Sequence, residues 1–424
     1  TRPKPSSGGI TKYSTWRKRK KGENPFMKRT FTAILCILAL CLPLTFASCS
    51  AAPPVEKNPM ADERLDDGMR TALGTLRQVD DKGKLYEMDV TFDYYGAAMQ
   101  KIMEDENYVK HDHGCTVFLT HNEAGEIITC RNFDTNHQAK TIEDAEGVYI
   151  VYHCHPEGKY SSVAIGDAKY CGDTAAQYHP GALNDGSSDI SMMIWGIFDV
   201  LDGINEKGLS VAVMSSDKRP DEETYSRGDP EKDTVVVDAL LRLMLDECAT
   251  VEEAVSLAGK YNVMPYTGSK KIDHVFVSDA AGASKVIEWR YNEMRVADTD
   301  ISTNFFQTWE DPEPHKVKTS KQQEVDSQLT KTYKDYQYGY GHGYDRFNMV
   351  ASTLQQYAEF DENGTYRTRL TDELARNLLS LVAQQHTPEM TSMTQYSVIY
   401  NQSALTADVW LSRDYSKKYT FKVR

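Results

Sequence analysis

The sequence lacks the short motifs that mark the commonest nucleotide, metal and dithiol sites. It contains no GxxxxGK[ST] phosphate loop, no HExxH zinc motif and no CxxC pair. Gly339, Gly341 and Gly343 alternate with other residues but do not complete a GxGxxG dinucleotide fingerprint. No sequence signal therefore remains for a nucleotide, a metal or another cofactor, and we expect none.

Positive charge is also scarce outside the N-terminus. Lys and Arg number 48 against 62 Asp and Glu, which gives a net charge of −14. The first thirty residues hold ten basic residues and one acidic residue, so the remaining chain carries −23. A body this acidic repels nucleic acid and anionic surfaces, and nucleic-acid partners are therefore not expected.

The first 49 residues read as a leader and not as part of a fold. Met27 precedes two basic residues, an apolar run and small residues, which is the pattern of a secretory signal. The apolar run is short for a membrane span. FASCS resembles a bacterial lipoprotein signal with Cys49 lipidated, although Phe46 stands where leucine is usual; ordinary cleavage near Ala52 is the alternative. We expect an exported bacterial protein, either anchored through Cys49 or secreted, and residues 1–26 read as upstream sequence.

Beyond the leader, the chain has an odd number of cysteines. In an exported protein this predicts at least one thiol outside any disulfide. Cys154 and Cys171 flank a hairpin-like stretch and could pair, while the others could equally be small buried hydrophobes. The five are Cys115, Cys130, Cys154, Cys171 and Cys248.

The sequence pattern changes at residue 115. Residues 50–114 begin with a Pro-containing tether and continue as polar sequence with too little apolar surface for a core of their own. From residue 115 onward, β-rich runs come in pairs, and runs such as TVVVDALLRLMLDE and TDELARNLLSLVAQQ predict amphipathic helices. Antiparallel strands and helices in blocks predict an α+β fold. The expected strands are 115–121 with 126–131, 208–214, 273–278 with 285–291, and 394–401 with 405–411.

The junction of Gly114 and Cys115 suggests a nucleophile. A cysteine attacks a carbonyl as its thiolate, so a base must first take the thiol proton. The histidines are poorly placed for that role, since His153 and His155 flank Cys154 and the others lie in polar stretches. If the chain is cut after Gly114, the new α-amino group of Cys115 titrates near neutral pH and can itself be the base. Glycine suits the cut because its carbonyl is unhindered.

Two charged residues follow at the end of the same predicted hairpin. Arg131 would lie beside the start of the first strand, where a guanidinium favours a thiolate. Asp134, three residues on, would hold the α-amino group. Each residue alone is more often a surface charge near a turn, but their joint placement after Gly-Cys supports a site.

With these residues in place, the sequence resembles the choloylglycine hydrolase and penicillin V acylase family of N-terminal nucleophile hydrolases. Cys115 opening a strand and CRNFD at 130–134 match the start of that family. The likeness covers nearly all of residues 115–424, and its strength lies in the order of the matches. The further segments are DGINEKGLSVA, DHVFVSDAAGASKVIEW, STNFF, DRFNMV and TQYSVIYNQSALTADVWL.

The resemblance implies roles for individual residues. Cys115 would be the nucleophile and its own base, flanked by the two charged residues above. Asn304 would point its side-chain amide at the oxyanion, and Arg346 would complete the polar network. The family commonly has asparagine where Ser215 aligns. The backbone N–H, which serine keeps, is the expected second oxyanion donor, so this departure bears on substrate contacts more than on chemistry.

The resemblance also implies a fold and a reaction. Residues 115–424 would form a four-layer αββα sandwich with two antiparallel sheets, and the reaction would be hydrolysis of a linear non-peptide amide through an acyl-enzyme. Phe305 and Phe306 point to an apolar acyl group. Tyr340 lies in a Tyr/Gly-rich stretch that is either an aromatic lid over the substrate or a surface loop. Bile-salt amides, penicillin V-like amides and N-acyl amides such as N-acyl homoserine lactones all fit.

Two other functions stay open. An acyltransferase would use the same nucleophile with a different acceptor, and an amphiphile-binding lipoprotein would have lost catalysis. The complete set of predicted site residues argues against the second. Residues 50–114 would be a linker and propeptide, cut at Gly114–Cys115 by Cys115 itself or by a separate protease. The expected partner is a small-molecule amide, and a homo-oligomer is left open.

Overall fold

The structure is a computed structural model of the chain. It describes residues 65–95, 113–137, 141, 145–171, 179–184, 190–217, 229–264, 271–290, 293–309, 343–360, 366–385 and 392–424. All of them belong to the unit Glu56–Arg424. The predicted leader, Cys49 and Tyr340 lie outside the described residues. Within the described ranges, no helix is long and apolar enough to cross a membrane.

The larger sheet has nine strands in the order β1-β2-β5-β6-β7-β8-β11-β12-β13. Its central strands are buried on both faces, so runs such as YIVYHC are apolar or aromatic at most positions instead of alternating with polar residues. The bounds are β1 Arg77–Gln78, β2 Leu85–Val90, β5 Tyr149–Cys154, β6 Ser162–Asp167, β7 Val200–Asn205, β8 Ser210–Asp217, β11 Lys271–Ser278, β12 Ser284–Arg290 and β13 Glu293–Asp298.

The smaller sheet has six strands in the order β14-β3-β4-β17-β18-β19. Its β3–β4 and β17–β18 hairpins confirm two of the predicted strand pairs, and β11–β12 confirms the third. The bounds are β3 His113–His121, β4 Ile127–Thr135, β14 Ile301–Ser302, β17 Met393–Asn401, β18 Thr406–Leu411 and β19 Tyr419–Lys422.

Helices lie outside the two sheets and begin where the sequence supplies caps. Thr250 caps α5 by accepting the N–H of Glu253, and Thr371 caps α8 by accepting the N–H of Leu374. The helices are α1 Asp67–Leu73, α4 Val237–Glu247, α5 Val251–Ala258, α7 Tyr344–Gln356 and α8 Asp372–Leu381, with 3₁₀ turns η2 Ala168–Tyr170 and η4 Ile190–Phe198. Two small sheets pair β9 Thr234–Val236 with β10 Asn262–Met264, and β15 Ala358–Phe360 with β16 Tyr366–Thr368.

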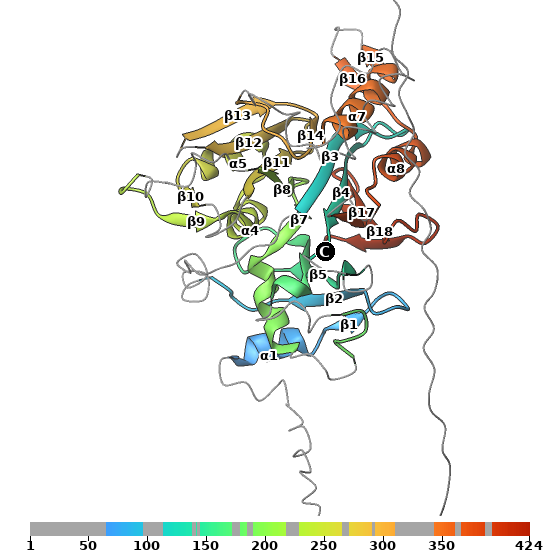
Figure 1. The fold of residues 1–424 in the computed structure, drawn as a ribbon. Helices are drawn as coiled ribbons and strands as arrows, with labels where there is room; N and C mark the ends of the chain where they lie inside the picture. The colour runs from blue at the N-terminus through green and yellow to red at the C-terminus, as the bar shows by residue number, and fades with distance from the viewer. Residues whose placement is uncertain are drawn as a thin grey trace, which may run out of the picture. The chain divides into compact units, whose positions relative to one another are not determined.

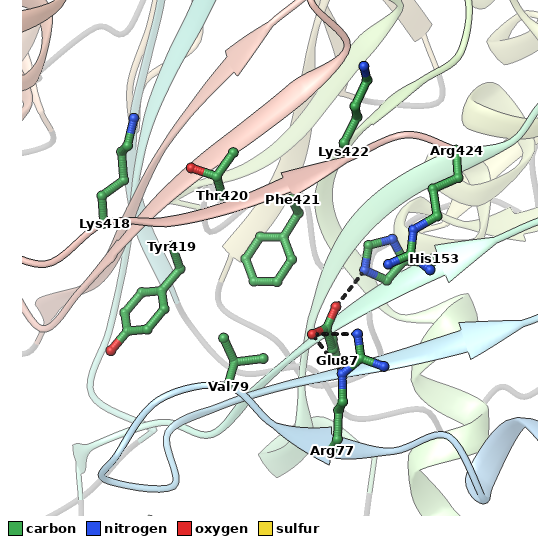
Figure 2. Close-up of a pocket in the computed structure, with 10 residues that line it drawn as sticks. All are labelled: Arg77, Val79, Glu87, His153, Lys418, Tyr419, Thr420, Phe421, Lys422 and Arg424. Carbon is green, nitrogen blue, oxygen red and sulfur yellow. Dashed lines mark hydrogen bonds and ion pairs between the residues drawn. The ribbon is translucent and has the colours of Figure 1, made fainter.

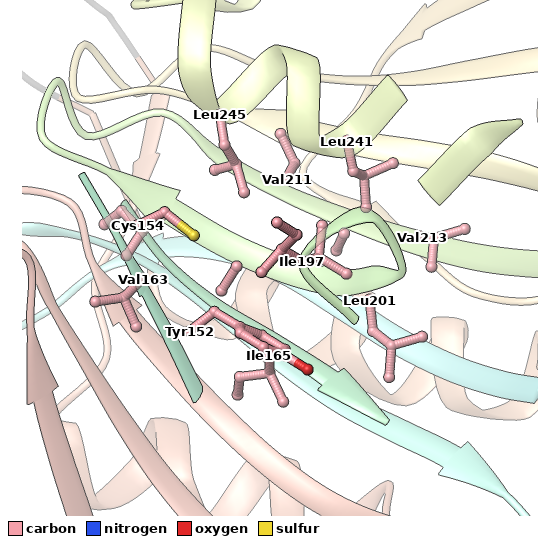
Figure 3. Close-up of a cluster of buried hydrophobic side chains, with 14 of the residues drawn as sticks. Tyr152, Cys154, Val163, Ile165, Ile197, Leu201, Val211, Val213, Leu241 and Leu245 are labelled. Atoms are coloured by element: carbon pink, nitrogen blue, oxygen red, sulfur yellow. The ribbon is translucent and has the colours of Figure 1, made fainter. Parts of the chain in front are cut away.

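The elements stack in four layers. Helix α4 packs on β7 and β8 of the nine-stranded sheet, and Figure 3 shows Leu241 and Leu245 of this helix above Val211 and Leu201. The opposite face of that sheet meets the six-stranded sheet, whose outer face is covered by α7 and α8 (Figure 1). The predicted α+β sandwich of helices, sheet, sheet and helices is confirmed.

Residues 65–95, here named the leading segment, are built into the nine-stranded sheet although they precede Cys115. Strand β2 pairs with β5 along its whole length. Beyond β2, the hydroxyls of Tyr94 and Tyr95 donate to the buried carboxylate of Asp246 in α4, at 2.9 and 2.6 Å. The leading segment therefore shares the core with residues that follow Cys115, which the sequence did not indicate.

The β2–β5 pair also corrects the expectation of two purely antiparallel sheets, because these two strands run parallel. The chain leaves the nine-stranded sheet after β2, forms the β3–β4 hairpin in the other sheet, and returns at β5. A crossover of this kind allows parallel pairing, which a tight turn does not.

None of the five cysteines in the described part of the chain forms a disulfide, and all five are buried. The alternative that Cys154 pairs with Cys171 is therefore wrong. Cys154 instead accepts from Arg242, at 3.4 Å, and Cys171 donates to the carbonyl of Asp167, at 3.5 Å.

Candidate active site

The candidate site lies where the two sheets face each other near the start of β3. Cys115 is the third residue of this strand and is fully buried. Its thiol donates to the carbonyl oxygen of Val213 in β8, at 3.5 Å. Burial raises the pKa of the Cys115 thiol to about 12. Because the chain runs unbroken through Gly114, this thiol is protonated and enclosed at neutral pH.

Arg131 brings a guanidinium to the thiol, as the hairpin predicted. It lies opposite Val117 in the β3–β4 ladder, two residues from Cys115 and on the same face of the sheet. Its Nη2 atom lies 3.5 Å from Cys115 Sγ. This charge favours the thiolate and opposes the effect of burial on the pKa of Cys115.

Asp202, in β7, is the counter-ion of Arg131. Both side chains are fully buried, and Arg131 Nε lies 2.8 Å from Asp202 Oδ2. The Tyr396 hydroxyl donates to Oδ2 at 2.5 Å, and the Tyr400 hydroxyl donates to Oδ1. Burial raises the pKa of Asp202, while Arg131 and the two hydroxyls act in the opposite direction. Asp202 was missed from the sequence, although it opens the DGINEKGLSVA segment.

Asp134 lies across the ladder from Gly114. Its side chain points to the other face of β4, where Thr394 donates to Oδ1 at 2.5 Å and Gln384 donates to Oδ2 at 2.5 Å. Burial raises the pKa of this carboxyl, while Arg346 and these donors oppose it. A Cβ on Gly114 would lie 2.8 Å from Gln384 Nε2 and 3.4 Å from Asp134 Cβ, so glycine also leaves room for this network.

Asn304 follows β14, the edge strand that pairs with β3. Its Oδ1 accepts the N–H of Cys115 at 2.9 Å, and its Nδ2 donates to the carbonyl of Ser215 at 2.7 Å. We expected the Asn304 amide to point at an oxyanion and Ser215 to act through its N–H. In this unbroken chain the side chain instead holds the nitrogen of Cys115, and Ser215 supplies the carbonyl that holds Asn304.

Arg346, in the first turn of α7, joins the main parts of the site. Its Nη1 donates to the carbonyl of Cys115 at 2.5 Å and to the Thr116 hydroxyl at 2.6 Å. Its Nη2 donates to Asn304 Oδ1 at 2.7 Å, and Nη1 lies 3.5 Å from Asp134 Oδ2. The structure thus brings together the predicted residues Cys115, Arg131, Asp134, Ser215, Asn304 and Arg346.

The two phenylalanines after Asn304 differ in their surroundings. The Phe305 ring stacks on Tyr344 of α7, with ring centroids 4.1 Å apart, and meets Phe347 edge-on at 5.2 Å. Phe306 is buried between His274, at 5.4 Å, and the guanidinium of Arg290, at 4.5 Å. Protein groups therefore surround Phe306, in contrast to the predicted role in substrate contact.

A cavity of about 480 Å³ lies elsewhere, between β1–β2 and β19 (Figure 2). Glu87 bridges Arg77 and His153 on one side of it, and Phe421 lies across from them. None of the site residues above lines this cavity. Among the described residues, no group of three or more His, Cys, Asp or Glu could hold a metal ion.

Comparison with solved structures finds three relatives of low identity. Penicillin V acylase from Agrobacterium tumefaciens is 19% identical over 70% of this chain and 83% of its own, with a TM-score of 0.42. A variant of the conjugated bile acid hydrolase from Clostridium perfringens is 17% identical over 73% and 92%, with a TM-score of 0.43. The Caenorhabditis elegans ortholog of N-acylethanolamine-hydrolyzing acid amidase is 16% identical over 73% and 100%, with a TM-score of 0.38.

A comparison with curated proteins finds no match. The TM-scores above all lie below 0.5, so the assignment of the family rests on a family model instead. The model for linear amide C–N hydrolases of the choloylglycine hydrolase family matches residues 115–328, just over half of the chain. The chain therefore belongs to the choloylglycine hydrolase family and is a linear amide C–N hydrolase.

Proposed function

We propose that this hydrolase acts on a linear amide with an apolar acyl group, and that Cys115 becomes the nucleophile when the Gly114–Cys115 bond is cut. The observation that carries the proposal is the convergence of Arg131, Asn304 and Arg346 on Cys115. The match to the family model also begins at Cys115.

The cut itself needs no other enzyme in this proposal. Cys115 Sγ attacks the carbonyl carbon of Gly114, the C–N bond breaks, and the nitrogen takes the thiol proton, which leaves a thioester. Water then hydrolyses the thioester to the Gly114 carboxylate and restores the thiol. Asn304 already holds the departing nitrogen at 2.9 Å. Before the cut this nitrogen is an amide and cannot be a base, so the uncut chain is inactive towards substrate.

Hydrolysis of substrate repeats the same bond changes with another carbonyl. The α-amino group of Cys115 takes the thiol proton and the sulfur attacks the amide carbon. The proton then passes to the leaving amine as the C–N bond breaks. The α-amino group next takes a proton from water, whose oxygen attacks the thioester and releases the acid. Arg131 favours the thiolate, Asp134 and Asn304 hold the amine, and Asn304 Nδ2 with the Ser215 N–H stabilises the oxyanion.

An apolar acyl group is favoured by the aromatic side chains next to Asn304. Phe305, Tyr344 and Phe347 pack together on the α7 side of the site. A panel of bile-salt amides, penicillin V and N-acyl homoserine lactones, read by mass spectrometry, tests the activity and identifies the acyl preference. Release of a free acid supports hydrolysis; transfer of the acyl group to an added amine would instead support the acyltransferase alternative.

Replacing Asn304 with alanine should lower kcat by about 10²–10³, the range for loss of one oxyanion donor. The cut at Gly114–Cys115 should slow as well, because Asn304 Oδ1 holds the Cys115 nitrogen. Steady-state kinetics and intact-mass analysis measure the two effects. A change confined to KM would mean that Asn304 binds substrate and does not act on the transition state.

Iodoacetamide should label Cys115 in the cut chain and spare it in the uncut chain of the same partly processed sample. A thiol of pKa about 12 is thiolate in about one molecule in ten thousand at pH 8, and here it is also buried. After the cut, an adjacent amine takes the proton. Mass spectrometry separates the two species in one reaction. Equal labelling of both would show that the α-amino group does not activate the thiol.

A further inference from the structure

The segment that carries Asn304 is held by side chains from β11 and β12 of the opposite sheet. His274 Nε2 donates to the carbonyl of Thr303, the residue before Asn304, at 2.8 Å. Glu288 Oε1 accepts the N–H of Gln307 at 2.7 Å. Glu288 Oε2 accepts the N–H and the hydroxyl of Thr308, at 2.8 and 2.5 Å.

His274 and Glu288 form one unit. They lie directly opposite each other in the β11–β12 ladder and are both fully buried. Residues directly opposite in an antiparallel pair share a face of the sheet, so both side chains reach the same segment from the same side. Arg290, two residues from Glu288, extends this contact by lying against the Phe306 ring at 4.5 Å.

The chemistry of these contacts fixes the segment. A buried carboxylate is costly unless it is fully hydrogen-bonded, and all three hydrogen bonds described for Glu288 go to residues 307 and 308. Burial lowers the pKa of His274 to about 4, so its ring is neutral at working pH. Its Nε2 must then carry the proton that it donates to Thr303, and its Nδ1 has no hydrogen-bond partner among the described residues.

We propose that His274 and Glu288 are positioning residues that hold Asn304 at the distance from Cys115 required for both the chain cut and amide hydrolysis. Neither residue contacts Cys115, Arg131 or Arg346 in the hydrogen bonds and ion pairs of the structure, so any effect on catalysis passes through residues 303–308. The inference rests on the proposed function of Cys115 and Asn304.

The test compares variants at His274 that keep or remove one donor. His274→Gln places an N–H donor at the level of Nε2, whereas His274→Leu leaves the carbonyl of Thr303 unpaired. A misplacement near 1 Å can lower a catalytic rate by about 10²-fold, so we expect kcat to fall about 10- to 100-fold in the leucine variant with KM nearly unchanged. The glutamine variant should recover most of this loss. Glu288→Gln should resemble the leucine variant, because its amide N–H₂ would face the donors of Thr308.

His153→Leu is the matched control. His153 is also a buried histidine of the nine-stranded sheet whose Nε2 contacts one partner, Glu87, at 3.0 Å, away from the site. Its replacement removes a similar side chain without touching residues 303–308. Equal losses of kcat in His153→Leu and His274→Leu would show a general packing effect and overturn the proposal.

A double-mutant cycle with Asn304→Ala isolates the path of the effect. If His274 acts through Asn304, His274→Leu should cost about 10- to 100-fold in the wild type and less than about 2-fold in the Asn304→Ala background. Equal costs in both backgrounds would overturn the proposal. Should the leucine variant not fold, His274→Asn, which keeps polarity but is too short to reach Thr303, gives the same comparison.

Two readouts keep the inference separate from the function on which it rests. Hydrolysis of a fluorogenic lauroyl amide follows catalysis, and the rate of cutting at Gly114–Cys115 follows the same geometry without any substrate. A wild type that neither cuts itself nor hydrolyses amides refutes the proposed function. A wild type that does both, with His274 variants unchanged in both rates, refutes the positioning role alone.

Discussion

Replacing Cys115 with alanine should abolish amide hydrolysis and leave the chain uncut at Gly114–Cys115. The variant removes the nucleophile of both reactions, and no other described thiol approaches Arg131 Nη2, Asn304 Oδ1 and Arg346 Nη1 as Cys115 does. The structural cost should be small, because the change deletes one buried sulfur from a strand whose backbone pairing is unchanged. Intact-mass analysis and an end-point assay with excess enzyme measure the two outcomes.

Cys130→Ala is the control for this experiment. Cys130 lies in the same hairpin and is equally buried, but it packs in the apolar cluster beneath α7 and α8. This variant should be cut and active. Cleavage of Cys115→Ala at the same bond would point to a separate protease, and more than a few per cent of residual activity would contradict the role of Cys115 as nucleophile. An uncut wild type with full activity would refute the N-terminal nucleophile itself.

Replacing Asp202 with asparagine should lower both stability and activity. Arg131 and Asp202 are fully buried, and removing one partner of such a pair leaves an uncompensated charge, which typically costs about 3–5 kcal/mol. The guanidinium also loses the carboxylate that orients it toward Cys115 Sγ. Urea unfolding measures the first effect, and kcat for the cut enzyme measures the second.

The double variant Arg131→Met with Asp202→Leu separates these two effects. Replacing both charged partners by apolar side chains of similar size is often neutral for stability. We expect the double variant to regain most of the lost stability and to remain nearly inactive, because no cation then favours the thiolate. Full activity in Asp202→Asn would show that Arg131 is oriented without its counter-ion.

The parts of the fold that depend on local pattern could be predicted from the sequence. Alternating and apolar runs around Gly-containing turns located the three hairpins, and Cys115 and Arg131 met because both lie in one of them. Asn304 and Arg346 could be named through resemblance alone, since they lie 189 and 231 residues from Cys115. Nothing local marks an asparagine after a short edge strand as part of a site.

The missed residues depend on contacts between distant strands. Asp202 is recognised by the hydroxyls of Tyr396 and Tyr400, which lie 194 and 198 residues away. Phe306 was assigned to substrate because it neighbours Asn304, but the turn after β14 directs its ring onto His274 and Arg290. The leading segment looked too polar for a core because most of its apolar residues gain burial from β5, η4 and α4.

The pairing of β2 with β5 bears on how this enzyme can be produced. A chain shortened to begin at Cys115 would present the right N-terminal residue, but β5 would become the edge of the nine-stranded sheet. All six residues of β5 are buried in the whole chain, so the new edge would expose unpaired backbone flanked by apolar side chains. Such edges recruit strands from other molecules, and the shortened protein should aggregate. Active enzyme is therefore best obtained from one long chain that folds first and is cut afterwards.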